Sequence, residues 1–280
     1  MTAIKDLEKQ WKQYYEAVKA ACNNYQSPKV SDSILDLVLW SLDFLNNHTN
    51  KIKLNSKIKD KAYHSYCLSD GKSARPANSE FFLNDEHSVT QLWKGNFVKL
   101  NQTDLQNVLY TAALAPCLAR DLFDRNDKKS SATYFECFIG HLFSKKFGCN
   151  PAAQESFQIG NKSVTLPTDF LFKTDKQNYH LPVKTSTRER IIQAWSHQRI
   201  LTEHTNGRFK GMFVIFAETK LDANNHEVIE ICVPDQWLIY QKYLARIDKI
   251  YYFDIPEKYA QLQKAYSDLF DIRPIAEAFQ

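Results

Sequence analysis

One short run of residues constrains the fold of this chain more than any other feature. Met212-Phe213-Val214-Ile215-Phe216 is apolar at every position. A strand with one solvated face alternates apolar and polar residues, whereas a strand that is covered on both faces shows no such alternation. The run therefore predicts a central strand in a sheet with helices on both sides. Residues 228–233 and 250–253 are predicted as further strands.

The segments around the central strand indicate the fold class. Short β-like runs precede it at residues 156–159, 163–165, 169–172 and 180–184. Helices are predicted before, between and after these strands, at residues 132–147, 187–202, 236–243 and 259–270. This order of elements is typical of the α/β (α+β) class, with a mixed central sheet flanked by helices.

The first part of the chain has the apolar spacing of helices. Apolar residues recur every three or four positions in residues 4–22 and again in residues 34–45, where Ser31 or Ser33 can cap the second helix. Residues 50–100 lack this period and are predicted to form polar loops and turns.

A third helix and a polar boundary follow these loops. Thr103 can cap the helix while Gln106 reaches back to it, and Pro116 predicts a kink or a break. Residues 124–131 are too polar to be buried without desolvating unpaired charge. We therefore predict a helical N-terminal region over residues 1–125 and a sheet-containing core over residues 126–280.

The charge and the composition exclude several classes of protein. The 280 residues include 36 Lys or Arg and 32 Asp or Glu, a formal net charge of +4. That excess excludes a histone-like protein that binds nucleic acid through bulk charge alone. The seven glycines form neither a G-x-G-x-x-G motif nor a complete phosphate-binding loop, which argues against the common nucleotide-binding folds.

The cysteines and the N-terminus indicate a cellular compartment. The six cysteines form no C-x-x-C pair, and the first residues lack the apolar run of a signal peptide. No segment approaches the roughly 20 apolar residues of a membrane helix. We expect free thiols, a reducing cytoplasm and no membrane contact.

Three ionisable residues lie where the predicted elements can bring them together. Glu136 lies within a predicted helix, Asp169 opens a predicted strand, and Lys184 ends the next strand. Antiparallel neighbours of this kind place Asp169 and Lys184 side by side at one sheet edge, with the helical Glu136 reaching the same point. Two carboxylates and an ammonium at one point suit a hard divalent cation and a positioned water that attacks a phosphate.

The segment after Lys184 carries side chains that suit the reading of DNA bases. Arg188, Glu189 and Arg190 lie in the first turn of the next predicted helix. Arginine pairs with guanine through two hydrogen bonds and a carboxylate accepts from cytosine N4, so the triplet suits adjacent G·C pairs. Residues 184–210 carry a net charge of +4, equal to that of the whole chain. The alternative is that the triplet only begins a solvated helix.

Together these motifs resemble the PD-(D/E)XK restriction endonucleases, most of all the group that reads CCGG, CCNGG or CCWGG cores. The resemblance covers about residues 130–255 and is carried by Phe135-Glu136, Pro167-Thr168-Asp169, Val183-Lys184 and Arg188-Glu189-Arg190. It implies a homodimer that cuts both strands of DNA with Mg²⁺. By this likeness the catalytic residues are Asp169, Lys184 and Glu136, and the two carboxylates hold the metal. The residues that contact DNA are Arg188, Glu189, Arg190 and Arg199.

Two positions depart from the pattern of the family. Many members have an acidic residue two positions before the lysine, where this chain has Pro182. The CC-GG group tolerates that loss, usually with an acid on the following helix. Here that helix offers His197 and Gln198, with Glu203 beyond them. We expect Gln198 or His197 to face the site as a weaker ligand, so the departure affects a second metal position more than the first. The alternative is an ordinary polar helix face.

The leading hypothesis is a type II restriction endonuclease of the bacterial cytoplasm. It hydrolyses double-stranded DNA at a short palindromic site that contains G·C pairs and leaves 5′-phosphate ends. The first 125 residues match no family and are assigned to dimerisation or DNA contacts; pairing of dimers into tetramers stays open. A cognate DNA methyltransferase is expected in the same system. Three alternatives remain: a repair or junction nuclease of the same fold, a DNA-binding module with a decayed catalytic centre, and a helical interaction protein.

Overall fold

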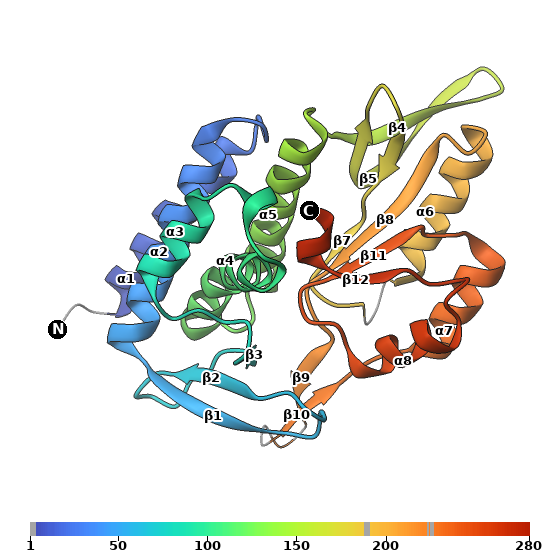
Figure 1. The fold of residues 1–280 in the computed structure, drawn as a ribbon. Helices are drawn as coiled ribbons and strands as arrows, with labels where there is room; N and C mark the ends of the chain where they lie inside the picture. Colours follow the sequence, from blue (N-terminus) through green and yellow to red (C-terminus); the bar gives the residue numbers. More distant parts are fainter. Residues whose placement is uncertain (1–3, 188–190, 223, 225–226) are drawn as a thin grey trace. The chain divides into compact units, whose positions relative to one another are not determined.

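The chain divides into two units that are each built from separate segments (Figure 1). The computed structural model describes residues 4–187, 191–222, 224 and 227–280. The first unit comprises Met1–His141, Thr219–Glu230 and Ala276–Gln280, and the second comprises Leu142–Glu218 and Ile231–Ile275. The polar run at residues 124–131 lies within the first unit, and its second half begins helix α5 (Lys128–Phe147).

Helices form most of the first unit. They are α1 (Ile4–Ala21), α2 (Pro28–His48), α3 (Glu86–Lys94), η1 (Phe97–Lys99), α4 (Gln102–Phe123), the first part of α5, and most of η3 (Ile275–Ala278). The helices predicted over residues 4–22 and 34–45 are confirmed. The cap of α2 is Ser27 and not Ser31 or Ser33, because Pro28 takes the first helical position and Ser27 accepts from the N–H of Lys29.

Helix α4 differs from the prediction at its cap and at its proline. Asn101, not Thr103, caps it by accepting from the N–H of Asp104, and Gln106 instead accepts from the N–H of Ala276. The helix continues through Pro116 without a break. Proline leaves the carbonyl four residues earlier without its helical donor, and here the hydroxyl of Tyr134 donates to that carbonyl of Ala112 at 2.7 Å.

The first unit also contains a sheet that the sequence did not predict. Its order is β3 (Ala77–Asn78), β2 (Tyr63–Cys67), β1 (Asn50–Ser56), β10 (Glu227–Glu230) and β9 (Thr219–Leu221). The interpretation of residues 50–100 as loop was therefore wrong: β1 alternates lysine with apolar residues, which is a strand period. The strand predicted at residues 228–233 exists as β10, but it pairs in parallel with β1 in this sheet.

The sheet of the second unit is built around β8. Its order is β12 (Ile272–Pro274), β11 (Lys249–Tyr252), β8 (Phe209–Ile215), β6 (Asn178–His180), β5 (Lys162–Lys173) and β4 (Ala152–Ile159), with β7 (Val183–Lys184) also paired to β8. Strand β8 pairs in parallel with β6, β7 and β11, whereas β4, β5 and β6 are antiparallel. The apolar run at residues 212–216 is therefore central, as predicted.

Both faces of this sheet are covered by apolar side chains. On one face Phe213 and Tyr252 pack with Trp195 and Trp237, which come from α6 (Ile191–His204) and α7 (Pro234–Ile239). The π-helical turn η2 (Tyr240–Leu244) and α8 (Glu257–Ala265) follow on the chain. On the other face Phe143 and Phe147, in the last turns of α5, pack against Tyr251 and Tyr179. The predicted class, a mixed sheet flanked by helices, is confirmed.

Two details of the strands bear on the site. The runs predicted at residues 163–165 and 169–172 are one strand, β5, and the run at 180–184 is two strands, β6 and β7, on either side of Leu181 and Pro182. Pro182 has no N–H to donate to a ladder, so the pairing is interrupted there.

Among the described residues no helix is long and apolar enough to span a membrane.

Candidate functional site

The backbone brings Asp169 and Lys184 to one edge of the second unit's sheet. Strand β5 carries Asp169 at an irregularity of its ladder with β4: Gln154 pairs with Pro167 but Ala152 pairs with Leu171, so β5 has two extra residues there. Such bulges redirect side chains and are common beside active sites. Lys184 ends β7, the strand that resumes after Pro182.

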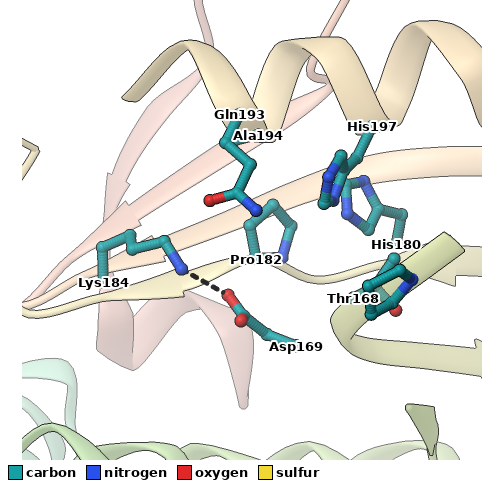
Figure 2. A pocket seen from close by; sticks show the side chains of 9 residues that line it. Thr168, Asp169, His180, Pro182, Lys184, Gln193, Ala194 and His197 are labelled. Atoms are coloured by element: carbon teal, nitrogen blue, oxygen red, sulfur yellow. Dashed lines mark hydrogen bonds and ion pairs between the residues drawn. The ribbon is translucent and has the colours of Figure 1, made fainter. Parts of the chain in front are cut away.

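The two side chains are in direct contact (Figure 2). Oδ2 of Asp169 accepts a hydrogen bond from Nζ of Lys184 at 2.8 Å and another from the backbone N–H of Val183 at 2.8 Å. The side chains of Asp169 and Lys184 are 25% and 28% exposed. The pair is therefore fixed by the backbone and still open to a ligand, and the side-by-side placement expected from the sequence is observed.

A pocket surrounds this pair within the second unit (Figure 2). Its walls come from the middle of β5, from β6 to β7, and from the first turns of α6. The lining residues are Pro167, Thr168, Asp169, His180, Pro182, Lys184, Gln193, Ala194 and His197. Helical spacing explains the wall from α6, because residues 193, 194 and 197 lie on one face of a helix.

Two imidazoles form the wall opposite Lys184. The ring centroids of His180 and His197 lie 6.3 Å apart. Burial lowers the pKa of His180 to about 4 against the opposing effect of a hydrogen bond with Gln198, and burial also lowers the pKa of His197. Both rings are therefore neutral at neutral pH, and in a neutral imidazole one nitrogen carries a lone pair that can accept a hydrogen bond.

Gln198 fixes His180 instead of lining the pocket. Its Oε1 lies 3.0 Å from Nδ1 of His180, while its Nε2 donates to the carbonyl of Phe209 at 2.9 Å and to Thr202 at 3.1 Å. These donations direct the oxygen of the amide to the ring, so Nδ1 of His180 carries the hydrogen. Of the two residues expected on this helix, His197 lines the pocket and Gln198 is buried beside it.

The remaining predicted residues lie elsewhere. Glu136 is half-buried on α5 in the part of that helix that belongs to the first unit, so its participation with Asp169 stays a prediction. Arg188, Glu189 and Arg190 lie outside the described residues. Arg199 is exposed on α6 and pairs with Glu203 at 3.0 Å.

Glu218 is a residue that sequence reasoning missed. It is fully buried after β8, and its carboxylate accepts from the backbone N–H of Thr187 at 3.0 Å, from the hydroxyl of Thr187, and from the hydroxyl of Tyr252 at 3.2 Å. It thereby holds the backbone directly before residue 188. The available signal was a single acid at the end of an apolar strand, which gives no indication of its partners.

The carboxylate in the pocket can coordinate a hard divalent cation that keeps most of its waters. Among the described residues, no three His, Cys, Asp or Glu side chains gather closely enough to hold a metal ion by themselves. Mg²⁺ commonly takes one or two carboxylates together with waters and phosphate oxygens. Asp169 supplies one such carboxylate, partly exposed at the pocket.

Comparisons with known proteins bear on the fold. No protein family and no curated protein matches the sequence. The structure is similar to the crystal structure of the type IIP restriction endonuclease Kpn2I, with a TM-score of 0.81, 21% sequence identity, and coverage of 96% of this chain and 95% of that one. A restriction endonuclease PspGI–substrate DNA complex is more distant, with a TM-score of 0.40, 16% identity, and coverage of 63% and 70%. The fold is therefore restriction-endonuclease-like, as the sequence predicted.

Proposed function

We propose that this chain is a type II restriction endonuclease. It hydrolyses phosphodiester bonds in double-stranded DNA with Mg²⁺, at a short palindromic site with a CC/GG core, and leaves 5′-phosphate ends. The observation that carries the proposal is the ion pair between Asp169 and Lys184 in an accessible pocket. The likeness of the fold to an enzyme described as a type IIP restriction endonuclease supports it.

The residues of the pocket have distinct roles in this reaction. Asp169, with Glu136 as the second carboxylate, would hold Mg²⁺, which supplies Lewis-acid stabilisation of the charge that develops on the phosphate. Lys184 donates to the attacking water and to the phosphate through its ammonium, which the contact with Asp169 holds in place. The N–H of Val183 keeps Asp169 oriented whether or not Lys184 moves toward the DNA.

His197 replaces the acid that related enzymes carry on this helix. Its imidazole is neutral because burial lowers its pKa, so it contributes a lone pair or an N–H to a water in the pocket, but no negative charge. This explains how a chain with Pro182 before its lysine retains polar groups on both sides of the pocket.

Recognition of the DNA sequence is assigned to residues 188–190, which follow Lys184 in the chain and precede α6. Arg188, Glu189 and Arg190 contact the G·C pairs, and Arg199 also contacts the DNA. A palindromic site has twofold symmetry, which a homodimer matches. We place the enzyme in the bacterial cytoplasm with a cognate DNA methyltransferase, and assign residues 1–125 to dimerisation or DNA contacts.

Removal of the lysine tests the catalytic role. In the presence of Mg²⁺, plasmid DNA is incubated with the wild type, with Lys184→Ala, and with Lys258→Ala, which changes an exposed lysine on α8. We expect the wild type and Lys258→Ala to cut, and Lys184→Ala to bind the same DNA without cutting it. Equal cutting by all three proteins would refute the role of Lys184.

A second candidate is a DNA-binding module that has lost catalysis. Two observations favour it: Pro182 stands where many family members have an acid, and no three-ligand group for a metal occurs in the part of the chain that the structure describes. A wild type that binds duplex DNA specifically but cuts it with neither Mg²⁺ nor Mn²⁺ would support this candidate.

A further inference from the structure

The β4–β5 ribbon has one face made entirely of uncharged residues. In this ribbon Ser156 pairs with Thr165, and Gln158 pairs with Ser163. Gln154 precedes Ser156 by one strand period. All five side chains are exposed, and we call them the polar face: Gln154, Ser156, Gln158, Ser163 and Thr165.

The opposite face of the ribbon anchors it to the core of the second unit. Phe157 and Leu166 pack against a cluster that contains Leu201 of α6. The ring of Phe157 also lies 4.8 Å from that of His204, at the end of the same helix. The polar face is therefore held on a fixed ribbon and directed away from the apolar core.

The composition of the polar face is unusual for an exposed edge. Strand β4 is the edge of its sheet, and solvated edges are commonly protected by lysine or other charged residues. Apart from the exposed Pro167, which pairs with Gln154, the outward positions carry an amide or a hydroxyl, which both donates and accepts hydrogen bonds. Such groups can pair with base edges, which present donors and acceptors side by side, and can donate to the oxygens of sugars and phosphates, which only accept.

The distance between the polar face and Asp169 corresponds to a few base pairs of a DNA duplex. Thr165 and Ser163 precede Asp169 by four and six residues on the same strand. At about 3.3 Å per residue they lie at most roughly 13 and 20 Å from it along the strand, because β5 is irregular beside Asp169; these lengths correspond to at most about four and six base-pair steps of about 3.4 Å. A two-stranded ribbon also has the width that the major groove admits.

We propose that the polar face of the ribbon contacts the DNA duplex beside the cleaved bond, outside the bases read by residues 188–190. This inference rests on the proposed function, because it takes Asp169 as the position of the scissile phosphate. It gives the enzyme a second contact surface, and it makes affinity depend on the length of duplex that flanks the site.

The test compares duplexes with long and short flanks. Binding is measured in the Lys184→Ala background, so that the DNA stays intact. The variants are Gln158→Ala with Ser163→Ala on the polar face and, as the control, Gln261→Ala, an exposed glutamine on α8. The short duplex ends about three base pairs from the cleaved bond, inside the reach of the polar face.

The expected result is a loss that appears only on the long duplex. When the flanks are trimmed, the affinity of the Gln261→Ala protein for the duplex falls about tenfold. A loss of one or two hydrogen bonds has an effect of this size. The polar-face variant binds the long duplex as weakly as the control binds the short one, and trimming changes its affinity no further. Equal affinities of variant and control on both duplexes would overturn the inference.

Two further outcomes are informative. If the variant dissociates into smaller species in sedimentation and loses affinity equally on both duplexes, the polar face joins two copies of the chain and the inference is wrong. If the control binds neither duplex, the proposed function itself fails, and that failure is distinct from a control that binds without dependence on its flanks.

Discussion

Nζ of Lys184 lies 2.8 Å from Oδ2 of Asp169, although the two residues are fifteen positions apart in the sequence. The contact forms because β6 and β7 follow one another along β8 while β5 pairs with β6, so the end of β7 reaches the irregular part of β5. An acid and a lysine thus share one pocket edge, with His180 and His197 opposite (Figure 2).

His197→Glu is expected to strengthen metal binding. The change puts a carboxylate on the wall that faces Asp169, and Mg²⁺ prefers carboxylate oxygens to imidazole. We expect Mg²⁺ affinity, measured by titration calorimetry, to rise on the order of tenfold, as for one charge-assisted contact. The concentration of Mg²⁺ needed for half-maximal DNA cleavage falls in parallel. His197→Gln adds no charge and is the control; an affinity that rises equally in both variants would contradict the role of the pocket.

Gln198→Ala is expected to destabilise the second unit. Without the amide, Nδ1 of His180 and the carbonyl of Phe209 lose buried partners. An unpaired buried group costs about 1–3 kcal/mol, so the free energy of unfolding in urea falls by that amount. Glu203→Ala on the exposed side of α6 is the control and changes it by less than about 0.5 kcal/mol. A Gln198→Ala protein as stable as the control would show that these bonds contribute nothing.

Glu218→Gln tests whether a buried carboxylate positions the DNA-reading segment. The neutral amide is a weaker acceptor for the N–H and hydroxyl of Thr187, at a cost of about 1–3 kcal/mol in unfolding free energy. Because Thr187 directly precedes residues 188–190, DNA affinity falls as well. Thr187→Ser keeps the hydroxyl and retains affinity. A variant that loses stability but binds DNA normally would restrict Glu218 to a role in folding.

His64, in the first unit, makes stability depend on pH. Burial lowers its pKa from 6.5 to about 4, so below about pH 6.5 the unfolded chain binds a proton that the folded protein does not. Its contribution to stability is therefore lost as the pH falls from about 6.5 to about 4. In urea titrations, His64→Gln should reduce the stability loss between about pH 7 and about pH 5 by about 2 kcal/mol. An identical pH dependence in both proteins would contradict this.

The sequence predicted the features that depend on neighbouring residues. The unbroken apolar run identified the central strand β8, and Asp169 and Lys184 lie side by side as expected. Asp169 lies within β5, however, and does not open a strand as predicted. The spacing on α6 left His197 and Gln198 as alternatives, because adjacent helical positions differ by about 100° and the helix phase was unknown. The structure places His197 in the pocket and turns Gln198 toward His180.

Contacts between residues that are far apart in the sequence could not be predicted from local patterns. Strand β10 has an ordinary strand pattern, but its partner β1 lies more than 170 residues earlier. Glu218 binds Thr187 across 31 positions, and Gln106 binds Ala276 across 170. The local signals of a cap or a turn cannot show such contacts, since they are fixed by the packing of whole elements.

The proposed activity can be tested by sequencing the ends of plasmid DNA cut by the purified chain in Mg²⁺. We expect double-strand breaks at one short palindromic sequence with a CC/GG core, with 5′-phosphate ends placed symmetrically on the two strands and no breaks when Lys184 is replaced by alanine. Ends scattered without a common sequence, or ends that persist in Lys184→Ala, would contradict it.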